Sequence, residues 1–293
     1  MKPAPEPTVG ALLRAAIRRL EGTSASPRAD AVRLLGCAAG LDATAALAHG
    51  ERPVSLEAEA RFESAIARRE KGEPVAYIVG TAGFYGRVFT VSPAVLVPRP
   101  ESEHLVEAAL ADLRARLARA PKRRLRACDV GTGSGALALT LAAELDALEV
   151  VACDVSEAAL AVARINAARL ELLARVRFVR GDLAGPLIEF GPYDAIVANL
   201  PYVPTAEVPI APDPVGFEPR VAVDGGRDGL ALYRRLLADI PRLAAPGASA
   251  FLEAAPGTID PLANLASQVL AGAHVEVGED YAGLERFVTV TLR

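Results

Sequence analysis

Apolar positions recur with two different spacings along this chain of 293 residues, and the change of spacing divides it. Over residues 1–74 they recur every three to four residues, as on an amphipathic helix. In "VGALLRAAIRRLEG" one helical face collects Leu12, Leu13, Ala16, Ile17 and Leu20. Two further helical stretches open with a serine in the N-cap position, Ser26 and Ser55. The pattern predicts a helical N-terminal domain over residues 1–74.

Residues 75–98 mix β-branched and aromatic residues with glycines, which predicts a β-hairpin or two short strands. A helix follows from about Glu101 to Arg119. From residue 125 short apolar runs alternate with amphipathic stretches, which is typical of a mainly parallel sheet with helices on both faces. The last two runs, "HVEVGED" and "RFVTVTL", predict an antiparallel pair. The expected fold class is α/β, with a Rossmann-like domain over residues 99–293 joined through a hairpin linker to the helical domain.

Composition and charge narrow the function classes. The formal net charge is −4, from 32 basic and 36 acidic residues, whereas a general nucleic-acid binder is usually basic. No apolar run is long enough for a membrane span, and prolines stand where a signal peptide would be apolar. The cysteines, Cys37, Cys128 and Cys153, are too scattered for a disulfide framework or a zinc site. We expect a cytoplasmic protein with no metal and no membrane, in which these cysteines are core residues.

A glycine loop, "GTGSG", follows the first predicted strand of the sheet. It comprises Gly131, Thr132, Gly133, Ser134 and Gly135. Asp154 ends the next strand, 19 residues after Gly135, where a carboxylate can accept hydrogen bonds from ribose hydroxyls. Asp182 and Leu183, after the third strand, are expected near an adenine, although Asp182 is also a candidate N-cap. The loop alone fits NAD and S-adenosylmethionine equally, because Ala136 satisfies the last position of the dinucleotide fingerprint.

In the stretch "VANLPYVP" an apolar run ends at the amide side chain of Asn199, and two prolines then restrict the backbone. Pro201 favours extended geometry at Leu200, so the Asn199 side-chain oxygen and the Leu200 carbonyl are held as two acceptors. Two acceptors suit the hydrogens of a planar –NH2 group, on which Tyr202 can stack. We assign Asn199, Pro201 and Tyr202 to catalysis, with Asn199 also at the cofactor crevice. The motif favours a methyltransferase over a dehydrogenase; the alternative is a tight turn with a capping asparagine.

These motifs resemble those of S-adenosylmethionine methyltransferases that modify planar nitrogens. "GEPVAYIVGTAGFYG", "VLVPRPESEHLVE", "FEPRVAVDGGRDGLALYRRLL" and "DYAGLERFV" are similar to the HemK/PrmC family, the glutamine methyltransferases of peptide chain release factors. The resemblance runs from about residue 70 to the end; before that only the helical character is shared. It implies a protein-(glutamine-N5) methyltransferase acting in translation termination on the GGQ motif of class-1 release factors. We expect a monomer with no sequence-specific nucleic-acid binding.

Carried over by position, the resemblance implies roles for individual residues. The glycine loop would touch the methionine part of the cofactor, Asp154 its ribose and Leu183 its adenine. The substrate glutamine would be held by Phe84, Asn199, Leu200, Pro201 and Tyr202. Arg99 and Glu101 would border the active site, and the N-terminal helices would dock the substrate.

The chain departs from the family pattern at a few positions. Leu200 stands where the family usually has proline, and Ser102 where it usually has threonine. Because Leu200 keeps its carbonyl, we expect Leu200→Pro to be nearly silent. Leucine also occurs at this position in ribosomal RNA adenine dimethyltransferases. Adenine in nucleic acid, and a glutamine in another protein such as a ribosomal protein, are therefore the alternative substrates.

Overall fold

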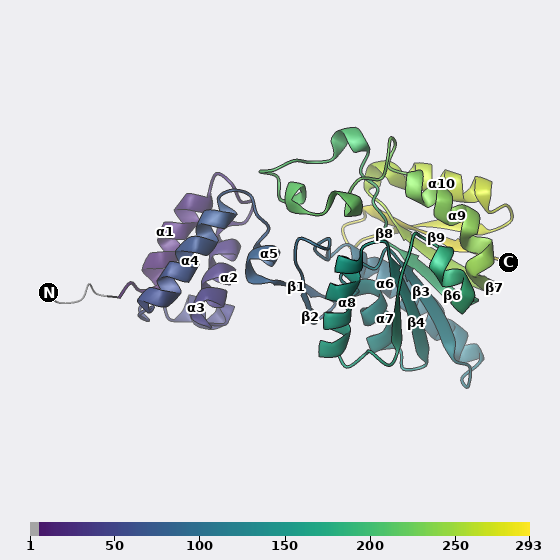
Figure 1. Ribbon diagram of the computed structural model, residues 1–293, viewed down its shortest axis with the longest axis horizontal. Coiled ribbons are helices and arrows are strands. Elements are labelled where there is room, and N and C mark those ends of the chain that lie inside the picture. The colour runs from purple at the N-terminus through teal and green to yellow at the C-terminus, as the bar shows by residue number, and fades with distance from the viewer. Residues whose placement is uncertain (1–5) are drawn as a thin grey trace. The chain divides into compact units, whose positions relative to one another are not determined.

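The computed structural model describes residues 6–293, and they form two compact units. The first unit comprises residues 6–81 together with Pro209–Phe217; the second comprises Ala82–Val208 and Glu218–Arg293 (Figure 1). No helix among the described residues is both long enough and apolar enough to cross a membrane.

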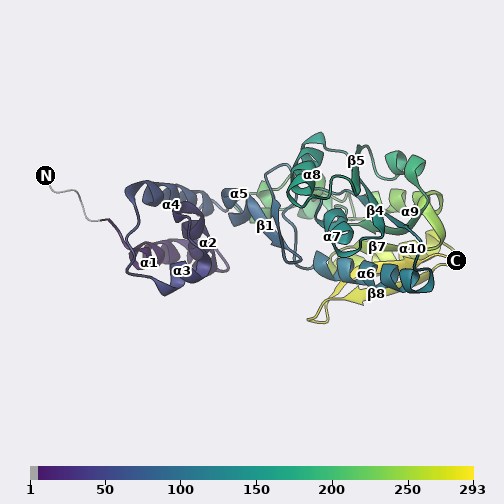
Figure 2. The same ribbon diagram turned by 90° about the horizontal axis from the view of Figure 1, so that it is seen from below.

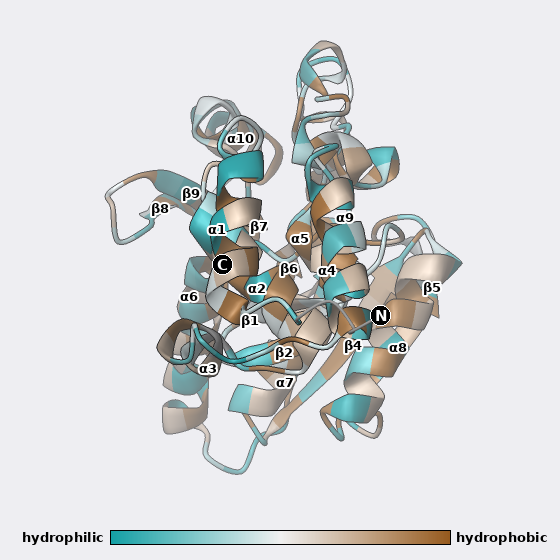
Figure 3. Ribbon diagram, turned by 90° about the vertical axis from the view of Figure 1, so that its left-hand side faces the viewer, coloured by the Kyte–Doolittle hydropathy of each residue, from teal (hydrophilic) through white to brown (hydrophobic). Residues whose placement is uncertain are grey.

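The first unit is helical. Its helices are α1 (Val9–Leu20), α2 (Pro27–Ala39), α3 (Ala43–Ala48), α4 (Leu56–Arg69) and α5 (Val75–Val79). In Figure 3 helices such as α1 and α4 carry both apolar and polar residues. The apolar faces of α1, α2 and α4 meet in one core around Leu20, Leu35 and Phe62, none of which is accessible to solvent. The predicted periodicity of this region is therefore confirmed.

Three local expectations for the first unit were wrong. Ser26 precedes α2 but makes no side-chain cap, and its backbone, at φ −140° and ψ 64°, departs from the geometry of Ser55, which caps α4 as expected. Cys37 is exposed on the outer face of α2, whereas Cys128 and Cys153 are buried. Residues 75–79 form a helical turn, not a strand, because Pro74 opens it and Gly80, at φ 76°, closes it in the left-handed region.

The second unit contains a seven-stranded sheet in the order β5-β4-β3-β6-β7-β9-β8. Its strands are β3 (Leu125–Val130), β4 (Leu148–Asp154), β5 (Val176–Arg180), β6 (Tyr193–Ala198), β7 (Ala244–Glu253), β8 (His274–Glu279) and β9 (Glu285–Thr291). Strands β3 to β7 pair in parallel, and β9 is antiparallel to both β7 and β8. The α/β fold class and the closing antiparallel pair are as predicted.

Helices cover both faces of this sheet (Figures 1 and 2). The helices are α6 (Ser102–Arg119), α7 (Ala136–Glu144), α8 (Glu157–Arg169), α9 (Ala231–Leu243) and α10 (Pro256–Val269). Side chains of β3 alternate between two cores: Leu125 and Ala127 join α6 and α7, while Cys128 and Val130 join α9 and α10. This alternation is what the pleat of a strand covered on both faces requires.

Two shorter parts lie outside this sheet. A hairpin of β1 (Thr81–Phe84) and β2 (Arg87–Thr90) precedes α6, and no strand follows it before residue 98. The proline-rich connection after β6 carries three 3₁₀ turns, η2 (Thr205–Glu207), η3 (Pro214–Phe217) and η4 (Arg220–Ala222); another, η1 (Gly185–Phe190), lies between β5 and β6.

Candidate active site

A cavity of the second unit lies at the carboxyl ends of its parallel strands. It measures about 350 Å³ and is lined by segments that follow β3, β4, β5 and β6. Strand β3 has β4 on one side and β6 on the other, so the chain reverses its direction of winding there. Open α/β sheets bind their ligands at such a switch point. The topology therefore places a ligand where the sequence motifs converge.

The glycine loop forms one wall of the cavity. A β-carbon on Gly133, at φ 53°, would meet no atom within 4 Å and would project into open space beside the loop. Gly135, at φ 83°, does not line the cavity; a β-carbon there would lie 2.9 Å from Leu139 Cδ1, so this glycine serves the packing of α7. The lack of a β-carbon thus leaves space for a ligand at Gly133 and allows close packing of α7 at Gly135.

Asp129 braces this loop, and the sequence analysis missed it. Its Oδ2 accepts hydrogen bonds from Thr132 Oγ1 at 2.7 Å and from the Ala138 N–H at 3.2 Å. Burial raises the pKa of Asp129 to about 7. An acidic residue immediately before "VGTGSG" was the available signal for this role.

Asp154 is held so that both carboxylate oxygens stay directed at the cavity rim. Oδ2 accepts the Gly133 N–H and Oδ1 accepts the Ser156 N–H, each at 2.9 Å. Burial raises the pKa of Asp154, and these backbone hydrogen bonds oppose the rise. Each oxygen keeps a further lone pair, so the carboxylate can still accept two hydroxyl hydrogens. This donor and acceptor set fits a ribose.

Asp182 and Leu183 also line the cavity. Leu183 has φ 50°, an uncommon value for a leucine, and its carbonyl accepts a hydrogen bond from Cys153 Sγ at 3.2 Å. The Asp182 carboxylate pairs with Arg235 at 2.5 Å, and the side chain does not cap the following turn η1. Leu183 therefore offers an apolar contact within the cavity, beside the Asp182 carboxylate.

The "NLPY" segment brings Asn199, Leu200 and Pro201 to the cavity wall. Asn199 Nδ2 donates to Ser102 Oγ at 3.1 Å, which leaves its Oδ1 for another donor. The Leu200 N–H donates to the Tyr233 hydroxyl at 3.1 Å. Leu200 itself is 3% exposed, so its side chain belongs to the core. Leu200→Pro would remove this hydrogen bond and this packing, so we expect it to lower stability; that it is nearly silent for activity stays a prediction.

Tyr202 is not among the residues that line the cavity. It lines a second cavity together with Val203, Pro204 and the start of α10. Burial raises the pKa of its hydroxyl to about 12. The structure therefore brings Asn199, Leu200 and Pro201 to the cavity of the glycine loop, whereas Tyr202 lines the second cavity.

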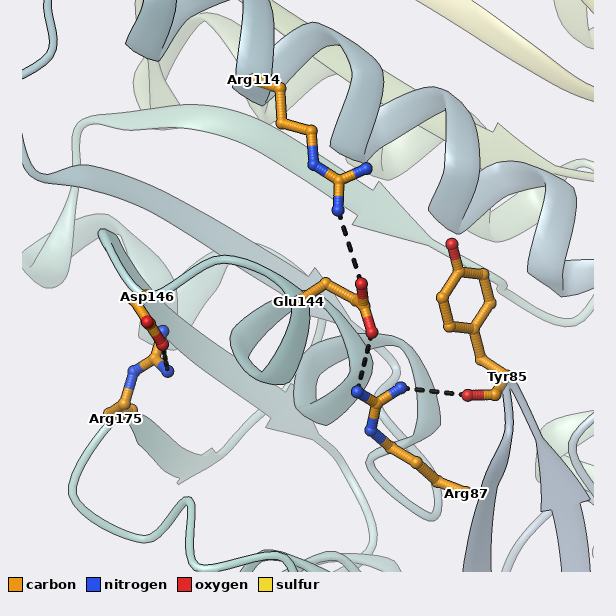
Figure 4. Close-up of polar contacts among 6 residues, drawn as sticks. All are labelled: Tyr85, Arg87, Arg114, Glu144, Asp146 and Arg175. Carbon is orange, nitrogen blue, oxygen red and sulfur yellow. Dashed lines mark hydrogen bonds and ion pairs between the residues drawn. The ribbon is translucent and has the colours of Figure 1, made fainter.

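Phe84 reaches the cavity from the hairpin and is 2% exposed. Its ring meets Phe89 edge to face, with centroids 6.1 Å apart. Figure 4 shows how the hairpin is fastened: Arg87 pairs with Glu144 at 2.7 Å, and Arg114 approaches the other oxygen of Glu144 at 3.4 Å. These ion pairs tie the hairpin to α6 and α7, so Phe84 is presented from a fixed support.

Arg99, before α6, and Ser102, the first residue of α6, line the cavity, but Glu101 does not. Arg99 pairs at 2.5 Å with Glu218, whose other carboxylate oxygen accepts the Val97 N–H at 3.0 Å. His104 packs edge to face against the Tyr281 ring and does not line the cavity.

Comparison with known families finds two matching regions. Residues 11–80 match the family described as the PrmC N-terminal domain, and residues 127–211 match a methyltransferase domain. The two regions fall in the helical unit and around the candidate site respectively.

Curated relatives match almost the whole chain. A release factor glutamine methyltransferase from Moorella thermoacetica is 42% identical over 95% of this chain and 96% of its own length. One from Deinococcus radiodurans is 40% identical over 94% and 95% of the two chains. Among solved structures, a methyltransferase from Pyrococcus furiosus has a TM-score of 0.50 at 19% identity, covering 78% of this chain and 96% of that one. The structural likeness concerns the fold alone.

Proposed function

This chain belongs to the family of release factor glutamine methyltransferases, and on that premise we propose that it methylates the side-chain amide nitrogen of a release factor glutamine. The glutamine is that of the GGQ motif in class-1 factors, and the methyl donor is S-adenosylmethionine. The observation that carries the proposal is the position of Asn199. Its amide is bonded to Ser102 through Nδ2, and it lines the same cavity as the glycine loop and Asp154.

The residues of the cavity fit this cofactor. The open space at Gly133 leaves room for the methionine part, Asp154 has lone pairs for the ribose hydroxyls, and Leu183 offers an apolar contact to the adenine. When bound, the cofactor supplies a methyl group activated by its sulfonium. Bringing donor and acceptor atoms to within about 3–3.5 Å in line is the main task left to the protein.

Asn199 and Leu200 orient the reacting nitrogen. The Asn199 Oδ1 and the Leu200 carbonyl each accept one N–H of the substrate amide, which turns the face of the nitrogen toward the methyl group. Positive charge develops on that nitrogen as the N–C bond forms, and two fixed acceptors stabilise it. The nitrogen, once methylated, releases one proton to water. Phe84 packs against the aliphatic part of the glutamine.

The helical unit is proposed to dock the protein substrate. It includes the region that matches the PrmC N-terminal domain, and its core is formed by apolar side chains such as Leu20, Leu35 and Phe62. Such a unit adds affinity for a macromolecule and leaves the chemistry to the cavity.

A labelling experiment tests the proposed function. The purified chain is incubated with methyl-labelled S-adenosylmethionine and, in separate reactions, a class-1 release factor, the same factor with its GGQ glutamine replaced by alanine, ribosomes, and ribosomal RNA. We expect label on the first substrate alone. Label on RNA, on ribosomal protein, or equally on both release factors would contradict the proposal.

A further inference from the structure

A buried carboxylate stands next to Asn199 at the end of the neighbouring strand. Strands β6 and β7 pair in parallel with Ala198 opposite Leu252, so Asn199 and Glu253 are the next residues along the two strands. Glu253 is 3% exposed, and its Oε2 is buried with no hydrogen-bond partner among the described residues. Burying a carboxylate is costly, so such a group at an active-site wall calls for an explanation.

Ser102 connects this carboxylate to the candidate site. Its Oγ accepts a hydrogen bond from Asn199 Nδ2 at 3.1 Å, and its own O–H remains available as a donor. Hydrogen bonds from the Ser102 and Asn199 side chains to Glu253 lower the pKa of that carboxyl, against the larger opposite effect of burial. Glu253, Ser102 and Asn199 therefore form one polar chain that leads from the core to the cavity.

We propose that Glu253 is a positioning residue for methyl transfer, acting on Asn199 directly and through Ser102 to keep the Asn199 Oδ1 turned toward the substrate amide. The inference rests on the proposed function. An ionised carboxylate is an acceptor only, so it fixes the direction of the whole chain: Ser102 donates to Glu253, and Asn199 Nδ2 donates to Ser102. A protonated Glu253 can donate to Ser102 instead. Ser102 can then donate to Asn199 Oδ1, which reverses the amide and presents N–H groups to a substrate that itself offers N–H groups.

Burial of Glu253 and the charges around it set the pH at which this reversal occurs. The negative charge of Glu101 favours protonation and the positive charge of Arg286 opposes it, while the phenol groups of Tyr202 and Tyr233 also face the carboxylate. Burial is the largest influence and raises the pKa of Glu253 to about 7. Since the ionised form is the competent one, kcat should be high above this pH and fall as the pH drops through it.

The test is the pH profile of kcat for release factor methylation by wild type and Glu253→Gln. Glutamine keeps the shape but does not fix the direction of the chain, so we expect kcat at pH 8 to fall by about 10–100-fold, by analogy with the loss of a hydrogen-bond partner that orients a metal ligand. The step near pH 7 should also disappear. The affinity for S-adenosylmethionine, measured by calorimetry, should not change. A glutamine variant that keeps the wild-type rate and pH step would overturn the inference.

A matched pair at Ser102 keeps the test decisive if Glu253→Gln does not fold. Ser102→Thr retains a hydroxyl and should keep the pH step, whereas Ser102→Ala should lose both rate and step. Equal pH profiles for the two variants would contradict the relay. Asp129 is the other carboxyl whose pKa is raised to about 7, so Asp129→Asn tests whether the pH step belongs to it. This variant should weaken cofactor binding and keep the step in kcat. If wild type does not label glutamine at all, the proposed function fails; if it does and Glu253→Gln behaves like wild type, only this inference fails.

Discussion

The backbone N–H of Leu200 is satisfied by the hydroxyl of Tyr233. Tyr233 is fully buried, and its hydroxyl donates in turn to the Glu253 carbonyl. A proline at position 200 would have no N–H to satisfy, so this hydroxyl matters because the residue is leucine. One side chain from α9 thus holds together the turn after β6 and the end of β7, the two segments that carry Asn199 and Glu253.

Tyr233→Phe should therefore lower the free energy of unfolding by about 1–3 kcal/mol, since it leaves a buried N–H without a partner. In a Leu200→Pro background no N–H is left, and the same change should cost about 1 kcal/mol or less, for the lost bond to the Glu253 carbonyl. Urea denaturation of the two single variants and the double variant measures the coupling. Additive effects would show that Tyr233 does not support the Leu200 N–H.

The hairpin is joined to the rest of the second unit by two kinds of contact. Asn166 of α8, 1% exposed, accepts the Thr90 N–H at 2.7 Å and donates to the carbonyls of Thr90 and Ser134 at 3.0 and 2.9 Å. It therefore bonds both the end of β2 and the glycine loop. The Arg87–Glu144 pair holds the same hairpin, but about a quarter of each side chain remains exposed.

Removing the buried contacts of Asn166 should lower the free energy of unfolding more than removing the Arg87–Glu144 ion pair. Asn166→Ala leaves several buried backbone groups unsatisfied, and we expect it to lower the free energy of unfolding by about 2–4 kcal/mol, counting about 1–3 kcal/mol for each unsatisfied group with partial relaxation. Glu144→Gln removes an ion pair that solvent screens, and it should cost about 1 kcal/mol or less. Chemical denaturation compares the variants, and calorimetry should show weaker cofactor binding for Asn166→Ala. A larger loss for Glu144→Gln would reverse this ranking.

Over the whole molecule, the sequence predicted what local patterns determine. The parallel strands are continuous apolar runs, and the glycine loop, Asp154 and Asn199 each follow one of them directly, so their meeting at one sheet edge follows from topology. The contacts behind the site were not predictable in this way. Asn199 and Ser102 are 97 residues apart, and Leu200 and Tyr233 are 33 apart, so only the folded chain reveals these pairs.

Where the sequence analysis erred, a non-local or capping effect outweighed composition. The β-branched residues of 75–79 predicted a strand, but the flanking Pro74 and Gly80 close a helical turn. The role assigned to Tyr202 stays a prediction, because the residue lines a second cavity while its hydroxyl also senses the charges of Glu253 and Arg99. Cysteine is usually buried, and this tendency predicted a core position for Cys37, but the residue lies on the exposed surface of α2.

In the first unit, Gly72 lies in close contact with the 209–217 segment. Gly72 has φ 92°, and a β-carbon there would lie 1.8 Å from the Pro212 carbonyl oxygen. Gly72→Ala should therefore displace the 209–217 segment, increase its cleavage by protease, and raise KM for intact release factor without changing cofactor affinity. Gly22→Ala is the matched control, because its β-carbon would meet no atom within 4 Å. Equal protease resistance and KM in both variants would contradict this account of the unit.

The most direct test of the central claim is the steady-state kinetics of Asn199→Ala with purified release factor. Asn199 supplies a preorganised acceptor at the nitrogen where charge develops, so its removal should lower kcat/KM by about 10²–10³-fold, the usual effect of losing one such group. Cofactor affinity and thermal stability, measured on the same preparation, should stay close to those of wild type. Undiminished kcat/KM in a folded Asn199→Ala variant would contradict the claim, and would mean that β6 ends on asparagine for the geometry of the turn alone.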